Sequence, residues 1–336
     1  MKAFTLIELI FVIVIFGIIS MFGADLYTKI YNSYAHTRAV NQLEARTMNA
    51  ISIISARLED RIKGTVIARM SSDDTFVDVR SATENHDIIE WIGQSIESKN
   101  LVRTAAGGPG SSIGWSGYAD VDSATDTTTG VAPLATASPA NLTFTLNSQG
   151  SNLTNASQII RRLRGNADAT FGVIFRNIIA TDVVQDAYGY NFNGTQLAEF
   201  VGTATGANEV ITITLPVRTD SLGDPIAKIS EQYHLAHSAY AIVPTNFTEP
   251  YNGPSGAKVA DWNFDLALHY NYTPWNGGAY NDAVNTSTAI MVRDVSLFRF
   301  RNDNGAIALK LCLRDAGRNF DPEKLDLIVC KSQVVY

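Results

Sequence analysis

The first 23 residues read MKAFTLIELIFVIVIFGIISMFG, and this stretch decides how the rest of the chain is arranged. From Phe4 to Phe22 it contains 19 residues, of which only Glu8 is charged. A helix that crosses the apolar core of a bilayer needs about 20 predominantly apolar residues. Lys2 precedes the run, and positive charges favour the cytoplasmic side of a membrane. The sequence therefore predicts one spanning helix, with the remaining chain on the far side.

Glu8 distinguishes this helix from an ordinary membrane anchor. A carboxylate inside a spanning segment costs about 2.5–3.5 kcal/mol on insertion scales, and such residues are usually functional. A cleaved secretory signal has a more basic start, a shorter apolar core and a small-residue cleavage site after it, none of which fits here. The remaining alternative is a plain anchor whose Glu8 side chain reaches back to the membrane surface.

The segment KAFTLIEL at residues 2–9, followed by the apolar run, resembles the leader of type IV pilin-like proteins. In that family a dedicated peptidase cuts before the phenylalanine and methylates its new amine. The resemblance implies a leader of residues 1–3, cleavage between Ala3 and Phe4, and N-methylation of Phe4. Glu8 would become the fifth residue of the mature chain. Most family members have glycine before the cut, where this chain has Ala3, so the match departs from the usual pattern at that position.

The resemblance also implies an assembly role for Glu8. The amine of Phe4 in a neighbouring subunit would meet the Glu8 carboxylate, and removing one partner of a buried ion pair typically costs about 3–5 kcal/mol. The implied partners are other pilins or pseudopilins, the prepilin peptidase, an inner-membrane assembly platform and the lipid bilayer. The implied location is the bacterial inner membrane, with a single pass and a periplasmic head. From there the subunit would enter a periplasmic pseudopilus or an extracellular pilus.

Helical periodicity continues beyond the apolar run, from residue 24 to residue 63. Apolar side chains recur at spacings of three, four or eight residues: Leu26, Ile30, Tyr34, Leu43, Ile51, Ile54, Leu58 and Ile62. Gly64 is a plausible residue to end the helix. One helix over residues 4–63 would be about 90 Å long at about 1.5 Å per residue. Its first half, residues 4–23, would lie in the membrane, and its amphipathic half, residues 24–63, would pack on a head.

The head, residues 64–336, is predicted to be rich in antiparallel β-strands. Alternating segments occur at 65–69, 76–79, 88–93, 141–146, 170–175, 209–217, 232–243, 264–272, 292–301, 306–313 and 325–335. Residues 105–139 are rich in glycine, serine and threonine, and we expect a long loop there. The predicted fold class is α+β, a pilin-like lollipop in which a long N-terminal helix packs on a large antiparallel head.

Two cysteines, Cys312 and Cys330, lie near the end of the chain. In an exported protein such a pair indicates one disulfide, whereas in a reducing compartment both would remain thiols. Asn304-Gly305 is a typical hairpin turn between the strands at 292–301 and 306–313. If the strands at 306–313 and 325–335 pair antiparallel, Cys312 can lie opposite Cys330. A disulfide near the end of the head is also a feature of many pilin-like proteins.

The region from Asn263 to Arg301 resembles, by pattern alone, the J-type minor pseudopilins of type II secretion and equally the W-type minor pilins. The favoured function is thus a structural, non-enzymatic minor pilin or pseudopilin that assembles into, initiates or caps a filament. The alternative is a pilus-tip adhesin or DNA-uptake pilin that binds a ligand through head loops. The tryptophans Trp91, Trp115, Trp262 and Trp275 are expected mostly in the core, with Trp115 and Tyr118 as the pair favoured for exposure.

No sequence motif points to a catalytic site or a resident cofactor. Nucleotide-binding glycine motifs, the Gly-x-Ser-x-Gly elbow and the HExxH zinc motif are absent from the sequence. His234 and His237 are three residues apart, which places them on opposite faces of a strand. The acidic groups Asp73-Asp74 and Asp120, Asp122 and Asp126 allow calcium but lack the spacing of a calcium loop. The net charge of −7 argues against nucleic acid as a partner.

Overall fold

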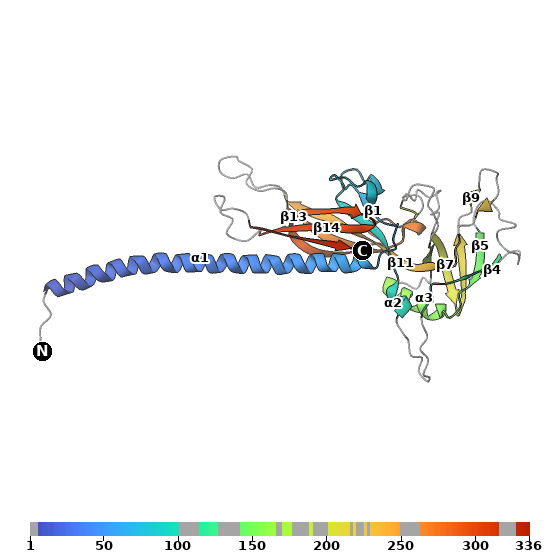
Figure 1. Ribbon diagram of the computed structural model, residues 1–336, viewed down its shortest axis with the longest axis horizontal. Helices are drawn as coiled ribbons and strands as arrows, with labels where there is room; N and C mark the ends of the chain where they lie inside the picture. Colours follow the sequence, from blue (N-terminus) through green and yellow to red (C-terminus); the bar gives the residue numbers. More distant parts are fainter. Residues whose placement is uncertain are drawn as a thin grey trace, which may run out of the picture.

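The computed structural model describes residues 6–100, 114–126, 142–165, 170–176, 188–190, 201–215, 218–219, 225–226, 229–248, 263–315 and 327–336. Helix α1 spans Leu6–Glu59. Its N-terminal end projects freely, and its C-terminal end packs on a β-rich head (Figure 1). Its 54 residues correspond to a length of about 80 Å. The α+β class, with one long apolar N-terminal helix and a large antiparallel sheet, is confirmed.

The end of α1 differs from the sequence prediction. The helix stops at Glu59 and not at Lys63. Beyond it, the backbone of Arg61 forms a β-bridge with Gly93, and the Ile62 N–H donates to the Ile92 carbonyl at 2.9 Å. Gly64 lies further on, in a turn, with φ +91°. The chain leaves the helix early because the sheet supplies hydrogen-bond partners that local periodicity does not reveal.

Thirteen strands of the described residues form one sheet. Its main path runs β15-β14-β13-β12-β11-β6-β7-β8-β5-β4, and β1, β2 and β3 attach beside β11. The bounds are β1 Ile67–Arg69, β2 Phe76–Asp78, β3 Ile88–Gln94, β4 Asp120–Asp126, β5 Leu142–Asn147, β6 Phe171–Phe175, β7 Val201–Ala207, β8 Val210–Leu215, β11 Tyr233–Thr248, β12 Asn263–Tyr272, β13 Ser287–Asp303, β14 Ala306–Arg314 and β15 Ile328–Val335. Strands β9 (Arg218–Thr219) and β10 (Pro225–Ile226) form a separate pair. Shorter helical elements are η1 Val79–Ser81, α2 Ile96–Asn100, α3 Leu153–Arg164 and η3 Pro274–Asn276.

The long strand β11 joins two parts of the sheet. Its first residues, from Tyr233 to Ala236, pair with β6, and the segment from Ala239 to Thr248 pairs with β12. Strand β3 pairs with β11 over Ala236–Ile242. Figure 1 shows β13 and β14 running along α1, whereas β5 and β7 lie beyond the end of the helix and run across that direction.

Each part of the sheet has its own core, and a third cluster of buried side chains joins β1, β3 and β11 to β6 and β7. The first core joins α1 to β3 and β11–β15 through fully buried side chains such as Ile51, Ile54, Leu58 and Trp91. The second core joins α3 to β4–β8 and the start of β11. Gly206 of β7 permits this contact, because a Cβ at that position would lie 2.6 Å from the Leu153 Cβ of α3.

Several elements of the second part were not predicted. Residues 105–139 were expected to be loop, but residues 120–126 form β4; much of the rest of that stretch lies outside the described residues. Strand β4 reads DVDSATD, which lacks apolar alternation. Among the described strands it pairs only with β5, at the end of the sheet. Helix α3 has the signals of its ends in the sequence, since Asn152 caps its start and Gly165, with φ 69°, follows its end.

The hairpins at the end of the chain follow the predicted pattern closely. Strand β13 begins at Ser287, earlier than the expected Val292, and turns at Asn304-Gly305 into β14. Strands β14 and β15 pair antiparallel with Cys312 opposite Cys330, and the two residues form a disulfide with Cα atoms 4.0 Å apart. The disulfide ties β15 to the sheet near the start of the strand.

Candidate functional site

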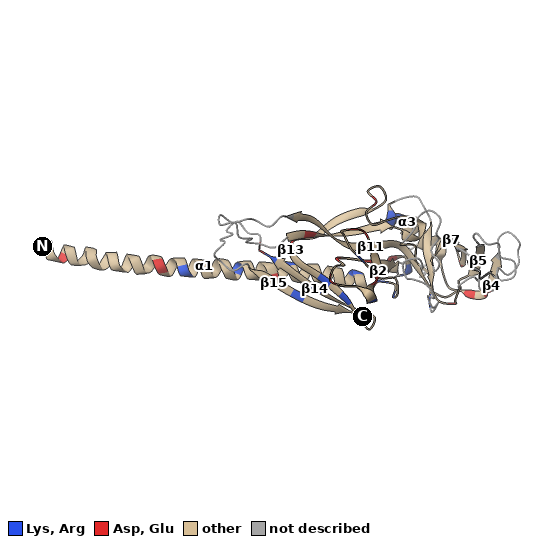
Figure 2. Ribbon diagram, turned by 90° about the horizontal axis from the view of Figure 1, so that it is seen from above, with Lys and Arg blue, Asp and Glu red and all other residues tan. Residues whose placement is uncertain are grey.

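The first half of α1 exposes an apolar surface that no other described part of the protein covers. From Leu6 to Phe22 every side chain is exposed, including Phe11 at 62% and Phe16 at 70%. By length and composition this helix could cross a membrane. Figure 2 shows that charged residues are sparse along this part of α1 and more frequent where the helix meets the head.

Glu8 lies in the first turn of the described helix, on the exposed stem. It is the sole charged residue between Leu6 and Phe22. Ala3 and Phe4, the expected cleavage and methylation positions, lie outside the described residues. The predicted meeting of Glu8 with the amine of a neighbouring Phe4 therefore stays a prediction.

The second half of α1 is attached to the head by apolar packing and by charged contacts. Glu44 pairs with Lys331 of β15, and the Arg46 guanidinium lies 3.2 Å from the Asp294 carboxylate of β13. These pairs are partly exposed, and each contributes about 0–1 kcal/mol. Most of the attachment therefore comes from the buried residues of the helix, Leu43, Thr47, Ala50, Ile51, Ile54, Ser55 and Leu58.

Arg61 forms a further attachment that the sequence analysis missed. Its guanidinium, in a residue only 6% exposed, donates to the carbonyl oxygens of Leu58 at 2.8 Å, Gly305 at 3.0 Å, and Val335 and Tyr336 both at 3.3 Å. Burial lowers the pKa of Arg61 from its usual value. One side chain thus connects the end of α1 to the turn before β14 and to the end of β15.

A buried ion pair connects β1 with β3. The Arg69 guanidinium donates to the Glu90 carboxylate at 3.0 and 3.2 Å, and the Tyr272 hydroxyl donates to the same carboxylate at 3.0 Å. Burial raises the pKa of Glu90, and the positive charge of Arg69 opposes that rise. The sequence offered a signal for this pair, since each residue is the single charge in an apolar strand, IAR and IIEWIGQ. The antiparallel pairing of β1 with β3 brings Arg69 next to Glu90, and the sequence alone does not show this pairing.

The two histidines of β11, His234 and His237, both have a lowered pKa. Burial lowers the pKa of His237 to about 4; Glu97 opposes this shift, whereas Arg164 and Arg57 add to it. Burial also lowers the pKa of His234 to about 4. Within the described residues, no group of three or more histidine, cysteine, aspartate or glutamate side chains is arranged to hold a metal ion.

The acidic residues considered for calcium have other roles or positions. Asp73 accepts hydrogen bonds from the N–H and hydroxyl of Thr75, and Asp74 pairs with Arg69 at 3.2 Å. The group at 120–126 was expected in a loop and instead belongs to β4. Neither group brings several carboxylates onto one point in the described structure.

The tryptophans are buried wherever the structure describes them. Trp91 and Trp115 are 0% exposed and Trp275 is 5% exposed, while Trp262 lies outside the described residues. The expectation that Trp115 is exposed is wrong, because its indole stacks on Tyr233 and donates to the Ser98 hydroxyl at 3.0 Å. Tyr118, the other member of that pair, is 58% exposed.

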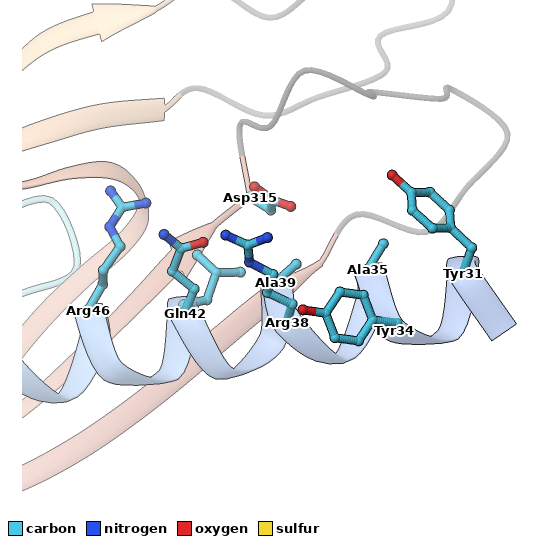
Figure 3. A pocket seen from close by; sticks show the side chains of 9 residues that line it. Tyr31, Tyr34, Ala35, Arg38, Ala39, Gln42, Arg46 and Asp315 are labelled. Carbon is cyan, nitrogen blue, oxygen red and sulfur yellow. The ribbon is translucent and has the colours of Figure 1, made fainter.

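A half-open pocket of about 310 Å³ lies where α1 leaves the head. Figure 3 shows Arg38, Gln42 and Arg46 on the side of α1 that faces Asp315. Asp315 is the last described residue before residues 316–326, which lie outside the described residues. We assign no ligand to it.

These features describe a long apolar helix that carries one acid near its start and is firmly attached to a β-rich head at its other end. The arrangement can insert into an apolar phase and hold the head at a set distance from it. In comparisons with known proteins, no family model, no curated protein and no solved structure matches the chain.

Proposed function

We propose that this chain is a structural minor pilin or pseudopilin, a membrane-anchored subunit that assembles into, initiates or caps a type IV pilus or a type II secretion pseudopilus. The proposal concerns assembly and not catalysis. One observation carries it: a 54-residue helix whose exposed apolar half bears a single acid, Glu8, while its other half packs on a β-rich head.

The acid supports assembly over simple anchoring for an energetic reason. An anchor helix is more stable in the bilayer without a carboxylate, which costs about 2.5–3.5 kcal/mol in a spanning segment. A neighbouring subunit with a free amine at Phe4 would offset that cost when the two helices pack side by side. Glu8 would thus set the axial position at which a subunit joins the filament.

The firm attachment of the head supports the same role. Arg61 and the buried face of α1 prevent the helix from separating easily from the sheet, so a displacement of the stem would move the head with it. A filament subunit needs this property because polymerisation moves the N-terminal helices, and the heads must move with them.

The proposal is tested with Glu8→Ala in the full-length chain, produced in cells that assemble it. We expect the variant to remain in the membrane fraction, while its amount in isolated filaments falls about tenfold or more, since an unpaired buried partner costs about 3–5 kcal/mol. Asp25→Asn is the matched control, because Asp25 is an exposed acid on the same helix that pairs with Lys29 at 2.8 Å. It should assemble at the level of the unmodified chain.

Mass spectrometry of the assembled chain gives an independent readout. We expect a mature N-terminus at Phe4 with one added methyl group. A chain that still begins at Met1 in working filaments, together with normal assembly of Glu8→Ala, would refute the proposal.

A further inference from the structure

The main path of the sheet ends at β15, and β14 is the only described strand that pairs with it. The Asp315 N–H donates to the Leu327 carbonyl at 3.0 Å, next to the registered pair Arg314 and Ile328. In an antiparallel ladder, hydrogen-bonded pairs alternate with non-hydrogen-bonded pairs. The odd-numbered residues of β15 therefore direct their N–H and C=O groups to β14. The even-numbered residues direct theirs away from the sheet: Ile328, Cys330, Ser332 and Val334.

Among the described residues this edge has no paired strand, and neither a proline nor a register shift protects it. All of its even-numbered residues are exposed, with Ile328 at 42% and Val334 at 45%. Natural proteins protect edge strands with charges, prolines, bulges or short length. Strand β15 has eight residues and no proline, and its single charge, Lys331, pairs with Glu44 of α1 on the helix side.

The opposite end of the sheet shows what protection looks like in this protein. Strand β4 has a register shift between its pairs with β5 and carries three acids: Asp120, Asp122 and Asp126. Repulsion between like charges and the irregular register both discourage strand addition there. The contrast marks the edge of β15 as suited to pairing.

The direction of β15 limits which chain can pair with it. Going from Glu44 of α1 to Arg61, just beyond the end of the helix, the contacts move along β15 from Lys331 to Val335, so the strand runs in the same direction as the helix. An antiparallel pair of two β15 strands would point the two α1 helices in opposite directions, which a shared membrane forbids. Strand β4 of a second copy is an unsuitable partner for β15, because its three acids and its register shift discourage strand addition.

We propose that β15 is a docking edge for an extended segment of a different protein, which adds an antiparallel strand to the sheet and runs towards the membrane. The inference rests on the proposed function in one respect, because the argument against pairing between two copies of this chain assumes that both are anchored in the same membrane. Backbone hydrogen bonds to Ile328, Cys330, Ser332 and Val334 hold the added strand, as in other β-strand additions. The disulfide from Cys330 to Cys312 keeps the edge in place before binding, which lowers the ordering cost.

The side chains of the edge define the kind of segment that fits. Ile328 and Val334 are apolar and lie at the two ends of the strand, with Cys330 and Ser332 between them on the same face. A matching strand has apolar side chains opposite Ile328 and Val334 and small or polar ones in between. Cross-strand pairs of this type each contribute about 0.2–1 kcal/mol beyond the backbone bonds.

The experiment places a small diazirine amino acid at position 328 in one full-length chain and at position 334 in another, in cells that assemble the protein. We expect both chains to cross-link to one segment of a single different protein. The attachment points should come in reverse order, about six residues apart, because antiparallel neighbours pair one to one. Attachment in the same order, cross-links to a second copy of this chain, or no cross-link in assembled particles would overturn the proposal.

Comparing Ser332→Pro with Ser332→Ala shows whether the cross-linked segment is hydrogen-bonded to the backbone of β15 or merely lies near it. Proline removes the outward N–H of residue 332 without touching the ladder to β14, whereas alanine keeps that N–H. We expect the cross-link yield to fall about tenfold with proline, because a buried carbonyl of the added strand loses the N–H of residue 332 as its donor. With alanine the yield should stay unchanged. Equal unfolding midpoints for the two variants exclude a folding defect, and equal cross-link yields would overturn the proposal. Glu8→Ala tests the proposed function separately.

Discussion

The Arg61→Met substitution should lower the free energy of unfolding by about 2–4 kcal/mol. Two of the four hydrogen bonds of Arg61 are short, 2.8 Å to Leu58 and 3.0 Å to Gly305. Bonds from a charged donor contribute about 1.5–3 kcal/mol each, so these two account for about 3–6 kcal/mol. Methionine removes the cost of burying the charge and keeps much of the packing, which reduces the net loss to the stated range.

The loss is measured by denaturant unfolding of the full-length chain in detergent, followed through the fluorescence of the buried Trp91 and Trp115. Arg57→Met is the matched control, because Arg57 is an exposed arginine near the end of α1 whose guanidinium lies over the Tyr240 ring at 5.8 Å. An exposed cation–π contact contributes about 0.5–1 kcal/mol, so the control should lose no more than that.

Arg61→Lys refines the test, because lysine keeps the charge but lacks the planar fork that reaches several carbonyls. We expect its loss to lie between those of the control and Arg61→Met. If Arg61→Met and Arg57→Met lose the same amount of unfolding free energy, the guanidinium does not hold α1 to β15, and the reasoning is refuted.

Two further predictions concern buried groups of the head. Glu90→Gln should cost up to about 3–5 kcal/mol in the same unfolding assay, because the buried Arg69 loses its buried carboxylate partner and keeps only the partly exposed Asp74; a loss typical of a surface substitution would contradict this. His237 has a pKa of about 4 in the folded chain against about 6.5 when unfolded, so the unfolded state gains the proton first. Stability should therefore be fully present above pH about 6.5 and fall as the pH is lowered toward about 4. His237→Gln should weaken that dependence, measured as unfolding midpoint against pH, and an unchanged slope would count against the assignment.

The sequence was most informative where structure depends on neighbouring residues. The apolar run with Glu8, the helical spacing from Leu26 to Ile62 and the alternation of β13, β14 and β15 are all local patterns. Each appears in the structure, although α1 ends at Glu59 and not Lys63, and β13 begins at Ser287 and not Val292. Local patterns failed for β4 and β7, because polar and small residues form strands there only through their pairing with β5 and with β6 and β8.

The sequence by itself determined a long helix with one acid in its apolar half, a β-rich head, and two cysteines placed on successive strands. Only the tertiary structure decided where α1 stops, that Arg61 reaches the carbonyls of β15, that Arg69 meets Glu90, and that β15 pairs on one side only among the described strands. The physical reason is common to all of these: each depends on contacts between residues far apart in the chain. Periodicity shows which face of a segment is apolar, whereas only the folded sheet shows which groups meet and which edge is left open.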